Sequence, residues 1–281
     1  MAPITAPSFA PLQCSAASLP QGESKTDGMA VQPFMCFNNL YAEVTDIMLG
    51  NKTISMVNDY FSEGDLIDEY NERVKRGLLG WEKTVVGDYM APPGSVLDVG
   101  CGCGREAFAL YDLGYQVIGV DLSEKQIEQA KKNALGFNKE IDFRVCDGIS
   151  YDFADSSFDY VIIWQQVLGN IPAHINRVGV LREARRVLKP HGKIIVSVHS
   201  YEYCMPVVEE KGLLVSTGEE ERDFILKEPY GNVCYWHYFT KDEFEQHFIE
   251  AGIDILRCDY ATAFGMPEGW ETIMVCVGEK I

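Results

Sequence analysis

The sequence has few basic residues, and this shortage bears on the partners that it can bind. It contains 24 Lys and Arg against 42 Asp and Glu, which gives a formal net charge of -18 at pH 7. Because Lys and Arg that neutralise phosphates supply much of the affinity for nucleic acid, this balance argues against a nucleic-acid partner. The acidic residues are spread along the chain, which is typical of a solvated surface.

The sequence also lacks long apolar runs and paired cysteines. No run reaches the roughly 18 apolar residues of a membrane-spanning helix, so we expect no membrane partner. The nine cysteines include no CxxC pair. Their odd number is unlike the disulfide framework of a secreted protein, which favours a reducing compartment and a cytoplasmic location. Cys101 and Cys103 lie in a glycine turn, where small side chains are needed, and we predict no metal site there.

The composition changes along the chain and suggests its organisation. The first 33 residues are rich in Ala, Pro and Ser, with one Lys and no Arg, which fits no targeting peptide and predicts a disordered leader. Residues 34–281 are expected to form one domain. Its expected parts are an N-terminal helical lid, a core, a cap insertion, and a C-terminal helix with strands, at residues 34–90, 91–199, 200–240 and 241–281.

Short apolar segments alternate with amphipathic helical segments through most of this domain. Such alternation predicts an α/β fold that is Rossmann-like and doubly wound. We expect a mostly parallel seven-stranded sheet with an antiparallel last strand. The expected strands are residues 95–99, 116–120, 141–145, 160–163, 193–198, 254–260 and 271–277. The expected helices are residues 105–113, 123–135, 176–188 and 241–251.

A glycine-rich turn follows the first expected strand, with Gly100, Gly102 and Gly104 in alternate positions. Glycine lets the backbone turn sharply and approach a ligand closely, and the next helix offers free N–H groups. Tight structural turns and dinucleotide sites both use such a turn. Asp121 ends the second strand, 21 residues after Gly100, where an acid reaches ribose hydroxyls. This spacing fits NAD as well as S-adenosyl-L-methionine (SAM).

Two further acids favour SAM over a dinucleotide. Asp98 lies inside the first strand, where a dinucleotide site normally has apolar residues, and it could pair with the ammonium group of SAM. Asp147 follows the third strand, where it could accept a hydrogen bond from an adenine amino group. The strand that begins with Phe158 and Asp159 then leads to the pair Gln165 and Gln166.

These motifs occur in the order found in class I SAM-dependent methyltransferases of the small-molecule type, which the chain resembles over residues 81–198 and more loosely to its end. The segment LREARRVLKPHG at residues 181–192 completes the resemblance. It implies SAM as cofactor and S-adenosyl-L-homocysteine as product. The residues that the resemblance assigns to cofactor binding are Asp98, Gly100, Cys101, Gly102, Gly104, Asp121, Leu122, Asp147, Gly148, Ile149 and Gln165.

The resemblance also implies a role for individual positions. The three glycines pass near the methionyl part of SAM, and Asp121 binds the ribose diol. Leu122 and Ile149 enclose the adenine, whose amino group meets Asp147. Gln165 lines the methionyl side, although the family often has an acidic or small residue there.

Methyl transfer is an in-line displacement at a sulfonium, so the protein mainly positions the acceptor and excludes water, and a base is optional. His199 follows the fifth strand, and His237 lies in an aromatic run, so either could be a general base or a packed, hydrogen-bonded histidine. The candidate substrate residues are Gln166, Tyr235, Trp236 and Tyr70, and core packing explains Tyr235 equally well. Packing against the sheet is the expected role of Trp81.

Three classes of function fit these features. A methyltransferase that acts on an O or N atom of a small molecule is favoured by the acidic charge and the aromatic cap. A methyltransferase acting on RNA or protein would need a basic path beside its pocket. A nicotinamide-binding or noncatalytic SAM-fold protein is the third alternative. The sequence predicts a small-molecule acceptor as partner but neither its identity nor an oligomeric state.

Overall fold

The structure is a computed structural model that describes residues 52–228 and 231–281. The expected leader and the first part of the expected lid lie outside these residues. Before the sheet, residues 52–61 are helical, and two helices follow, α2 (Gly64–Val74) and α3 (Gly80–Tyr89). The helical prediction is therefore confirmed for the part of residues 34–90 that the structure describes.

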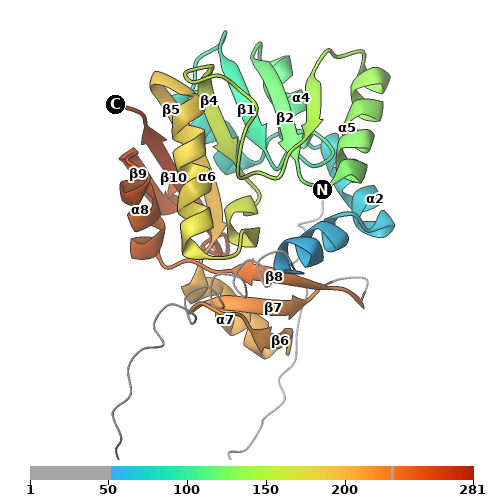
Figure 1. Cartoon of the computed structure of the whole chain (residues 1–281), viewed down its shortest axis with the longest axis vertical. Coiled ribbons are helices and arrows are strands. Elements are labelled where there is room, and N and C mark those ends of the chain that lie inside the picture. Colours follow the sequence, from blue (N-terminus) through green and yellow to red (C-terminus); the bar gives the residue numbers. More distant parts are fainter. Residues whose placement is uncertain (1–51, 229–230) are drawn as a thin grey trace, which may run out of the picture.

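The main sheet has seven strands in the order β3-β2-β1-β4-β5-β10-β9 (Figure 1). β1, β2, β3, β4 and β5 pair in parallel, whereas β10 is antiparallel to both of its neighbours. The predicted doubly wound, mostly parallel sheet with an antiparallel last strand is thus confirmed. The strands are β1 (Ser95–Val99), β2 (Gln116–Asp121), β3 (Asp142–Val145), β4 (Phe158–Ile163), β5 (Leu188–His199), β9 (Asp254–Tyr260) and β10 (Ile273–Glu279).

Helices cover both faces of this sheet. Those between and after the strands are α4 (Arg105–Asp112), α5 (Glu124–Phe137), α6 (His174–Val187) and α8 (Lys241–Glu250), with short 3-10 turns η1 (Val167–Asn170) and η3 (Ala261–Phe264). α3, α4 and α5 pack their buried side chains on one face, and α6 and α8 pack theirs on the other. Each face therefore has its own apolar core, which is why most residues of the central strands are apolar.

The core beneath α3 is centred on two tryptophans. Trp81 on α3 is fully buried, and its ring lies 5.4 Å from that of Trp164, which follows β4, at an interplanar angle of 69°. This edge-to-face arrangement is favourable for aromatic rings. The expected packing role of Trp81 is confirmed.

The cap segment, residues 200–240, contains more regular structure than its sequence pattern indicates. It forms the helix α7 (Tyr201–Glu210) and a separate antiparallel sheet of β6 (Leu214–Thr217), β7 (Asp223–Lys227) and β8 (Val233–His237), which lies below the main sheet in Figure 1. α7 contains Pro206 and buries Cys204, Met205 and Val208, whereas β6 is exposed at every residue and so lacks the alternating burial on which a strand prediction depends.

Candidate active site

The glycine turn joins β1 to α4 and is fixed to the neighbouring strand. The N–H groups of Gly100 and Cys101 both donate to the carbonyl of Val120 in β2, at 2.8 and 3.0 Å. Gly100, Gly102 and Gly104 have φ of +76°, +51° and +94°. These values lie in the left-handed region that favours glycine, so the turn needs glycine at all three positions.

Close packing adds a second requirement at Gly100. A Cβ atom there would lie 2.3 Å from Cγ2 of Val167 in η1. Gly148 has almost the same φ, +77°, but a Cβ atom would meet nothing within 4 Å. Substitution at Gly148 therefore introduces backbone strain alone, whereas substitution at Gly100 introduces both backbone strain and steric overlap.

We expect Gly148→Ala to lower the free energy of unfolding by about 1–2 kcal/mol, the cost of a left-handed residue with a Cβ atom. Gly100→Ala should lose about 1–3 kcal/mol more, because its Cβ atom would displace Val167. Urea denaturation of both variants measures the difference. Equal losses would show that η1 adjusts freely to the added methyl group.

A cavity opens beside this turn at the carboxyl ends of β1, β2 and β4. It encloses about 980 Å³, counting its open mouth, which suits a small-molecule ligand. The predicted site residues on its lining are Tyr70, Gly100, Gly102, Asp121, Leu122, Asp147, Gly148, Ile149 and Gln165. The fold thus brings together most of the residues that the sequence assigned to a cofactor, from four separate loops.

Asp121 lies at the centre of this arrangement. Its Oδ2 accepts a hydrogen bond from the N–H of Gly102 at 2.9 Å, and its Oδ1 accepts one from Ser123 N–H at 2.8 Å. Burial raises the pKa of Asp121, while these N–H donors oppose that shift. A carboxylate has about four acceptor positions, so both oxygens keep a lone pair for a ligand.

The loop after β3 forms another wall of the cavity. Asp147 Oδ1 accepts hydrogen bonds from the N–H groups of Ile149 at 2.9 Å and Ser150 at 3.1 Å. Asp147 and Ile149 are exposed, and both line the cavity. The loop therefore presents a carboxylate and an apolar side chain next to each other.

Asp98, Cys101 and Gly104 do not line the cavity, although the sequence assigned them to cofactor binding. Gly104 caps α4 and packs against Phe108 and Phe143 instead. Cys101 is buried, and burial raises the pKa of its thiol well above the usual value. Cys101 and Gly104 therefore pack on the side of the turn that faces the core.

Asp98 is 2% exposed, and its Oδ2 has no hydrogen-bond partner among the described residues. Burial, and next the carboxylate of Glu106, raise its pKa well above the usual value. A buried carboxyl oxygen without a partner is rare in proteins and indicates that a polar group belongs beside it.

The sequence analysis did not predict an ion pair between Arg105 and Glu82 next to the turn. Arg105 donates to both carboxylate oxygens of Glu82 on α3, at 2.6 and 2.8 Å. Gln165 Nε2 donates to Glu82 Oε1 at 3.0 Å. Glu82 therefore links α3, the start of α4 and the end of β4, and it orients the amide of Gln165 at the cavity.

The sequence reading also missed the apolar part of the lining. The helical segment at residues 52–61, called the first helix below, contributes Ile54, Val57 and Phe61 to the lining. The segment around η1 contributes Val167 and Ile171. The three- and four-residue spacing of the first set is a helical signal, but it does not show which surface the helix faces.

His199 lies outside the cavity lining, on the α3 side of the sheet. Its Nδ1 is buried without a hydrogen-bond partner in the described part of the chain. Its ring contacts Trp236 and Tyr238, with centroids 5.3 and 5.4 Å away. Burial lowers the pKa of His199 to about 4, so the imidazole is neutral at pH 7.

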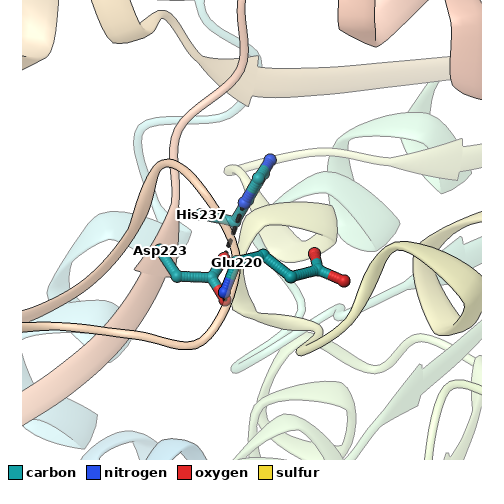
Figure 2. Close-up of side chains that lie close together, drawn as sticks. All are labelled: Glu220, Asp223 and His237. Carbon is teal, nitrogen blue, oxygen red and sulfur yellow. Dashed lines mark hydrogen bonds and ion pairs between the residues drawn. The ribbon is translucent and has the colours of Figure 1, made fainter. Parts of the chain in front are cut away.

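His237 lies in a polar cluster with Asp223 and Glu220 of the cap segment (Figure 2). Its Nδ1 lies 2.7 Å from Asp223 Oδ1, and its Nε2 lies 2.9 Å from Glu243 Oε1. Tyr235 OH donates to the same Asp223 oxygen at 2.7 Å. Neither His237 nor Tyr235 lines the cavity, and both nitrogens of His237 are occupied.

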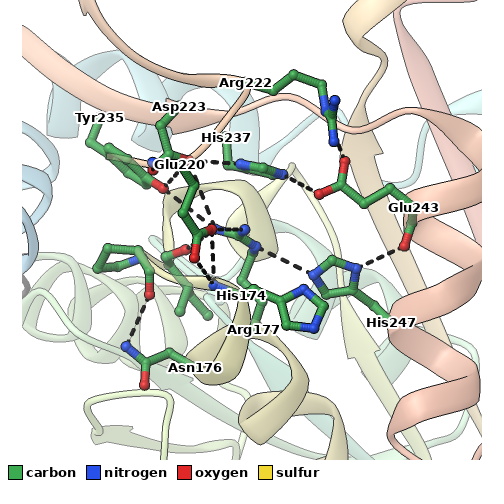
Figure 3. Close-up of polar contacts among 12 residues, drawn as sticks. His174, Asn176, Arg177, Glu220, Arg222, Asp223, Tyr235, His237, Glu243 and His247 are labelled. Carbon is green, nitrogen blue, oxygen red and sulfur yellow. Dashed lines mark hydrogen bonds and ion pairs between the residues drawn. The ribbon is translucent and has the colours of Figure 1, made fainter. Parts of the chain in front are cut away.

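Glu220, Asp223 and His237 also have the ligand types of a metal site, with one atom of each lying within 4.8 Å of the others. A cation already occupies this cluster, however. Arg177 Nη2 lies 2.6 Å from Glu220 Oε2, and its Nη1 lies 4.0 Å from Asp223 Oδ1 (Figure 3). The guanidinium supplies the positive charge that the carboxylates require.

Of the remaining substrate candidates, Tyr70 and Trp236 pack against the same apolar cluster, which includes Val57 and Tyr235. Gln166 is buried, and its Nε2 lacks a hydrogen-bond partner within residues 52–228 and 231–281. Trp236 donates from Nε1 to Glu228 Oε1 at 2.6 Å in the cap segment. Tyr70 lines the cavity beside the glycine turn, where a Cβ atom added to Gly102 would lie 3.7 Å from the Tyr70 ring.

The doubly wound sheet, the glycine turn and the acid that ends β2 define a class of protein. It is one that binds an adenosine-containing ligand at the carboxyl ends of its strands. The family model of the methyltransferase domain matches residues 96–192.

Three known proteins show the likeness. Demethylmenaquinone methyltransferase from Staphylococcus haemolyticus is 30% identical over 193 residues, which are 63% of this chain and 76% of that protein. Phosphoethanolamine N-methyltransferase 1 from Arabidopsis thaliana is 33% identical over 134 residues, 47% of this chain but only 26% of that longer protein. The crystal structure of a SAM-dependent methyltransferase from Methanosarcina mazei superimposes with a TM-score of 0.60 at 23% identity, covering 70% of this chain and 97% of that one.

The chain belongs to the class I SAM-dependent methyltransferases. The cofactor of this family is SAM, as the sequence predicted, and not a nicotinamide dinucleotide. Within the residues that the structure describes, no helix is long and apolar enough to cross a membrane.

Proposed function

We propose that the protein transfers a methyl group from SAM to an O or N atom of a small-molecule acceptor. The observation that carries this proposal is the cavity itself, which unites the glycine turn, Asp121 and the Asp147 loop at the carboxyl edge of the sheet. Bound there, SAM supplies an electrophilic methyl group on a sulfonium. The chain's own residues bind the two reactants, orient them in line and exclude water.

In this proposal each acid of the site binds a different part of the cofactor. Asp121 accepts hydrogen bonds from the ribose hydroxyls, and Asp147 accepts one from the adenine amino group, with Leu122 and Ile149 against the ring. Asp98 lies behind the cavity lining, and its Oδ2, which has no hydrogen-bond partner among the described residues, would pair with the ammonium group of the methionyl part. Gln165, held by Glu82, faces the methionyl side.

The acceptor would meet the apolar wall made by the first helix and the segment around η1. That wall suits an apolar ring such as a quinol, and relatives of the chain are named for demethylmenaquinone and phosphoethanolamine. Gln166, Tyr70 and Trp236 stay candidates for acceptor contacts. A base is optional in this proposal, and neither candidate histidine lines the cavity. Both nitrogens of His237 are engaged, whereas Nδ1 of His199 has no hydrogen-bond partner among the described residues.

A reducing, cytoplasmic location fits the same proposal. All seven cysteines that the structure describes are free thiols. The acidic charge continues to favour a small molecule over nucleic acid as the acceptor.

Calorimetry with S-adenosylhomocysteine and with NADH tests the cofactor, and we expect binding of the first alone. Transfer of labelled methyl from SAM into a metabolite extract, followed by mass identification of the product, then identifies the acceptor. Binding of NADH without binding of S-adenosylhomocysteine would overturn the proposal.

A further inference from the structure

The cavity has one wall whose backbone is strained. This wall segment, residues 165–173, contributes five residues to the lining: Gln165, Val167, Asn170, Ile171 and Pro172. Its ends have positive φ at residues other than glycine, +53° and +65° at Gln165 and Gln166 and +66° at Ala173. Such conformations cost free energy and persist only where the surrounding structure holds them.

Part of this restraint comes from the cap segment. Ala173 is the N-cap residue of α6 but has no side chain that could accept a hydrogen bond. Glu220 of the cap segment takes this place, because the N–H of His174 donates to its Oε1 at 2.8 Å and to its Oε2 at 3.0 Å. A carboxylate is favourable at a helix N-terminus, where the free N–H groups carry partial positive charge.

Arg177 joins the same carboxylate to the wall segment (Figure 3). Its Nη2 donates to Glu220 Oε2 at 2.6 Å, and its Nη1 donates to the carbonyl of Ile171 at 3.1 Å. The Arg177 side chain is 1% exposed, so without Glu220 its charge would lose its closest carboxylate in a buried place. Asn170 Nδ2 adds a contact to the cap backbone, at 2.8 Å from the carbonyl of Tyr235.

We propose that Glu220 is a positioning residue for the cofactor cavity. Through the N-terminus of α6 and through Arg177, it holds the wall segment in the conformation that the ligand requires. The cap segment thereby shapes the cofactor side of the cavity although Glu220 itself does not line it. This inference rests on the proposed function, since the ligand in question is SAM or its product.

The test compares Glu220→Ala, Glu220→Gln and the control Glu221→Ala. Glu221 is the neighbouring carboxylate, its side chain is 85% exposed, and it pairs with Arg222. Calorimetry measures S-adenosylhomocysteine affinity well below the unfolding temperature, and hydrogen exchange measures the opening of residues 165–174. If the wall segment is correctly placed about a tenth of the time in Glu220→Ala, affinity falls about 10-fold.

We expect that loss together with faster exchange in residues 165–174 but not in β1 or α5. Glu220→Gln keeps an acceptor for His174 and should lie between wild type and Glu220→Ala; it also decides the matter if Glu220→Ala does not fold. Unchanged affinity in the alanine variant, with or without faster exchange, would overturn the inference. If the wild type itself bound no S-adenosylhomocysteine, the proposed function would fail, and unchanged exchange would then separately overturn the role of Glu220.

Discussion

Asp121→Ala is expected to weaken S-adenosylhomocysteine binding about 100-fold, or about 2.7 kcal/mol. In the proposed complex Asp121 accepts hydrogen bonds from the two ribose hydroxyls, and bonds to a charged acceptor are each worth about 1.5–3 kcal/mol. The same carboxylate also holds Gly102 N–H and Ser123 N–H, so its loss releases the turn as well. Calorimetric titration of the purified variant measures the change.

Asp142→Ala is the matched control for this experiment. Asp142 lies on the adjacent strand β3, its side chain is 48% exposed, and it pairs with Arg144 away from the cavity. It changes the net charge by the same amount, so a loss common to both variants would be a general effect of charge. If Asp121→Ala binds S-adenosylhomocysteine as tightly as Asp142→Ala does, Asp121 does not contribute to ligand binding.

Trp81→Ala is expected to lower the free energy of unfolding by about 3–5 kcal/mol, the usual loss on truncating a large core aromatic residue. Trp81 is fully buried against Trp164, and no small movement of α3 can fill the space that the indole leaves. Urea denaturation, followed by circular dichroism, measures this loss.

Trp81→Phe separates packing from hydrogen bonding at this position. The indole Nε1 has no hydrogen-bond partner in the described part of the chain, so phenylalanine removes a buried donor along with some volume. We expect it to lose less than half as much as Trp81→Ala. Trp270→Ala, at a partly exposed position beside the same core, should also lose less. A Trp81→Phe loss equal to that of alanine would show that the indole N–H makes a contact that matters.

Strands and helices of the core could be predicted because their signals are local. The helix over residues 124–137 has Ser123 as N-cap, whose Oγ accepts from Gln126 N–H, and the strands are short apolar runs bounded by glycine or polar turns. The cap segment could not be predicted in the same way. Its β6 is fully exposed and depends on pairing with β7, and its helix contains Pro206 and packs against Tyr238 and Phe224.

The candidate site likewise contains residues that could be predicted from local sequence patterns and residues that could not. Gly100, Asp121 and Asp147 were found from their places after or at the end of parallel strands, together with the family resemblance, because such strand ends meet at one edge of a sheet. The first helix and the wall segment were not found, because apolar spacing shows that a helix has a buried side but does not identify the surface that buries it.

The sequence by itself determined the fold class, the family and the loops that line the cavity, because glycine turns and apolar strand segments are each encoded over a few residues. Only the tertiary structure decided which contacts the histidines and the cap segment make. His237 is engaged on both sides by carboxylates, and Glu220 reaches α6 from 46 residues further along the chain. Such contacts depend on the packing of elements distant in sequence, and no local pattern records them.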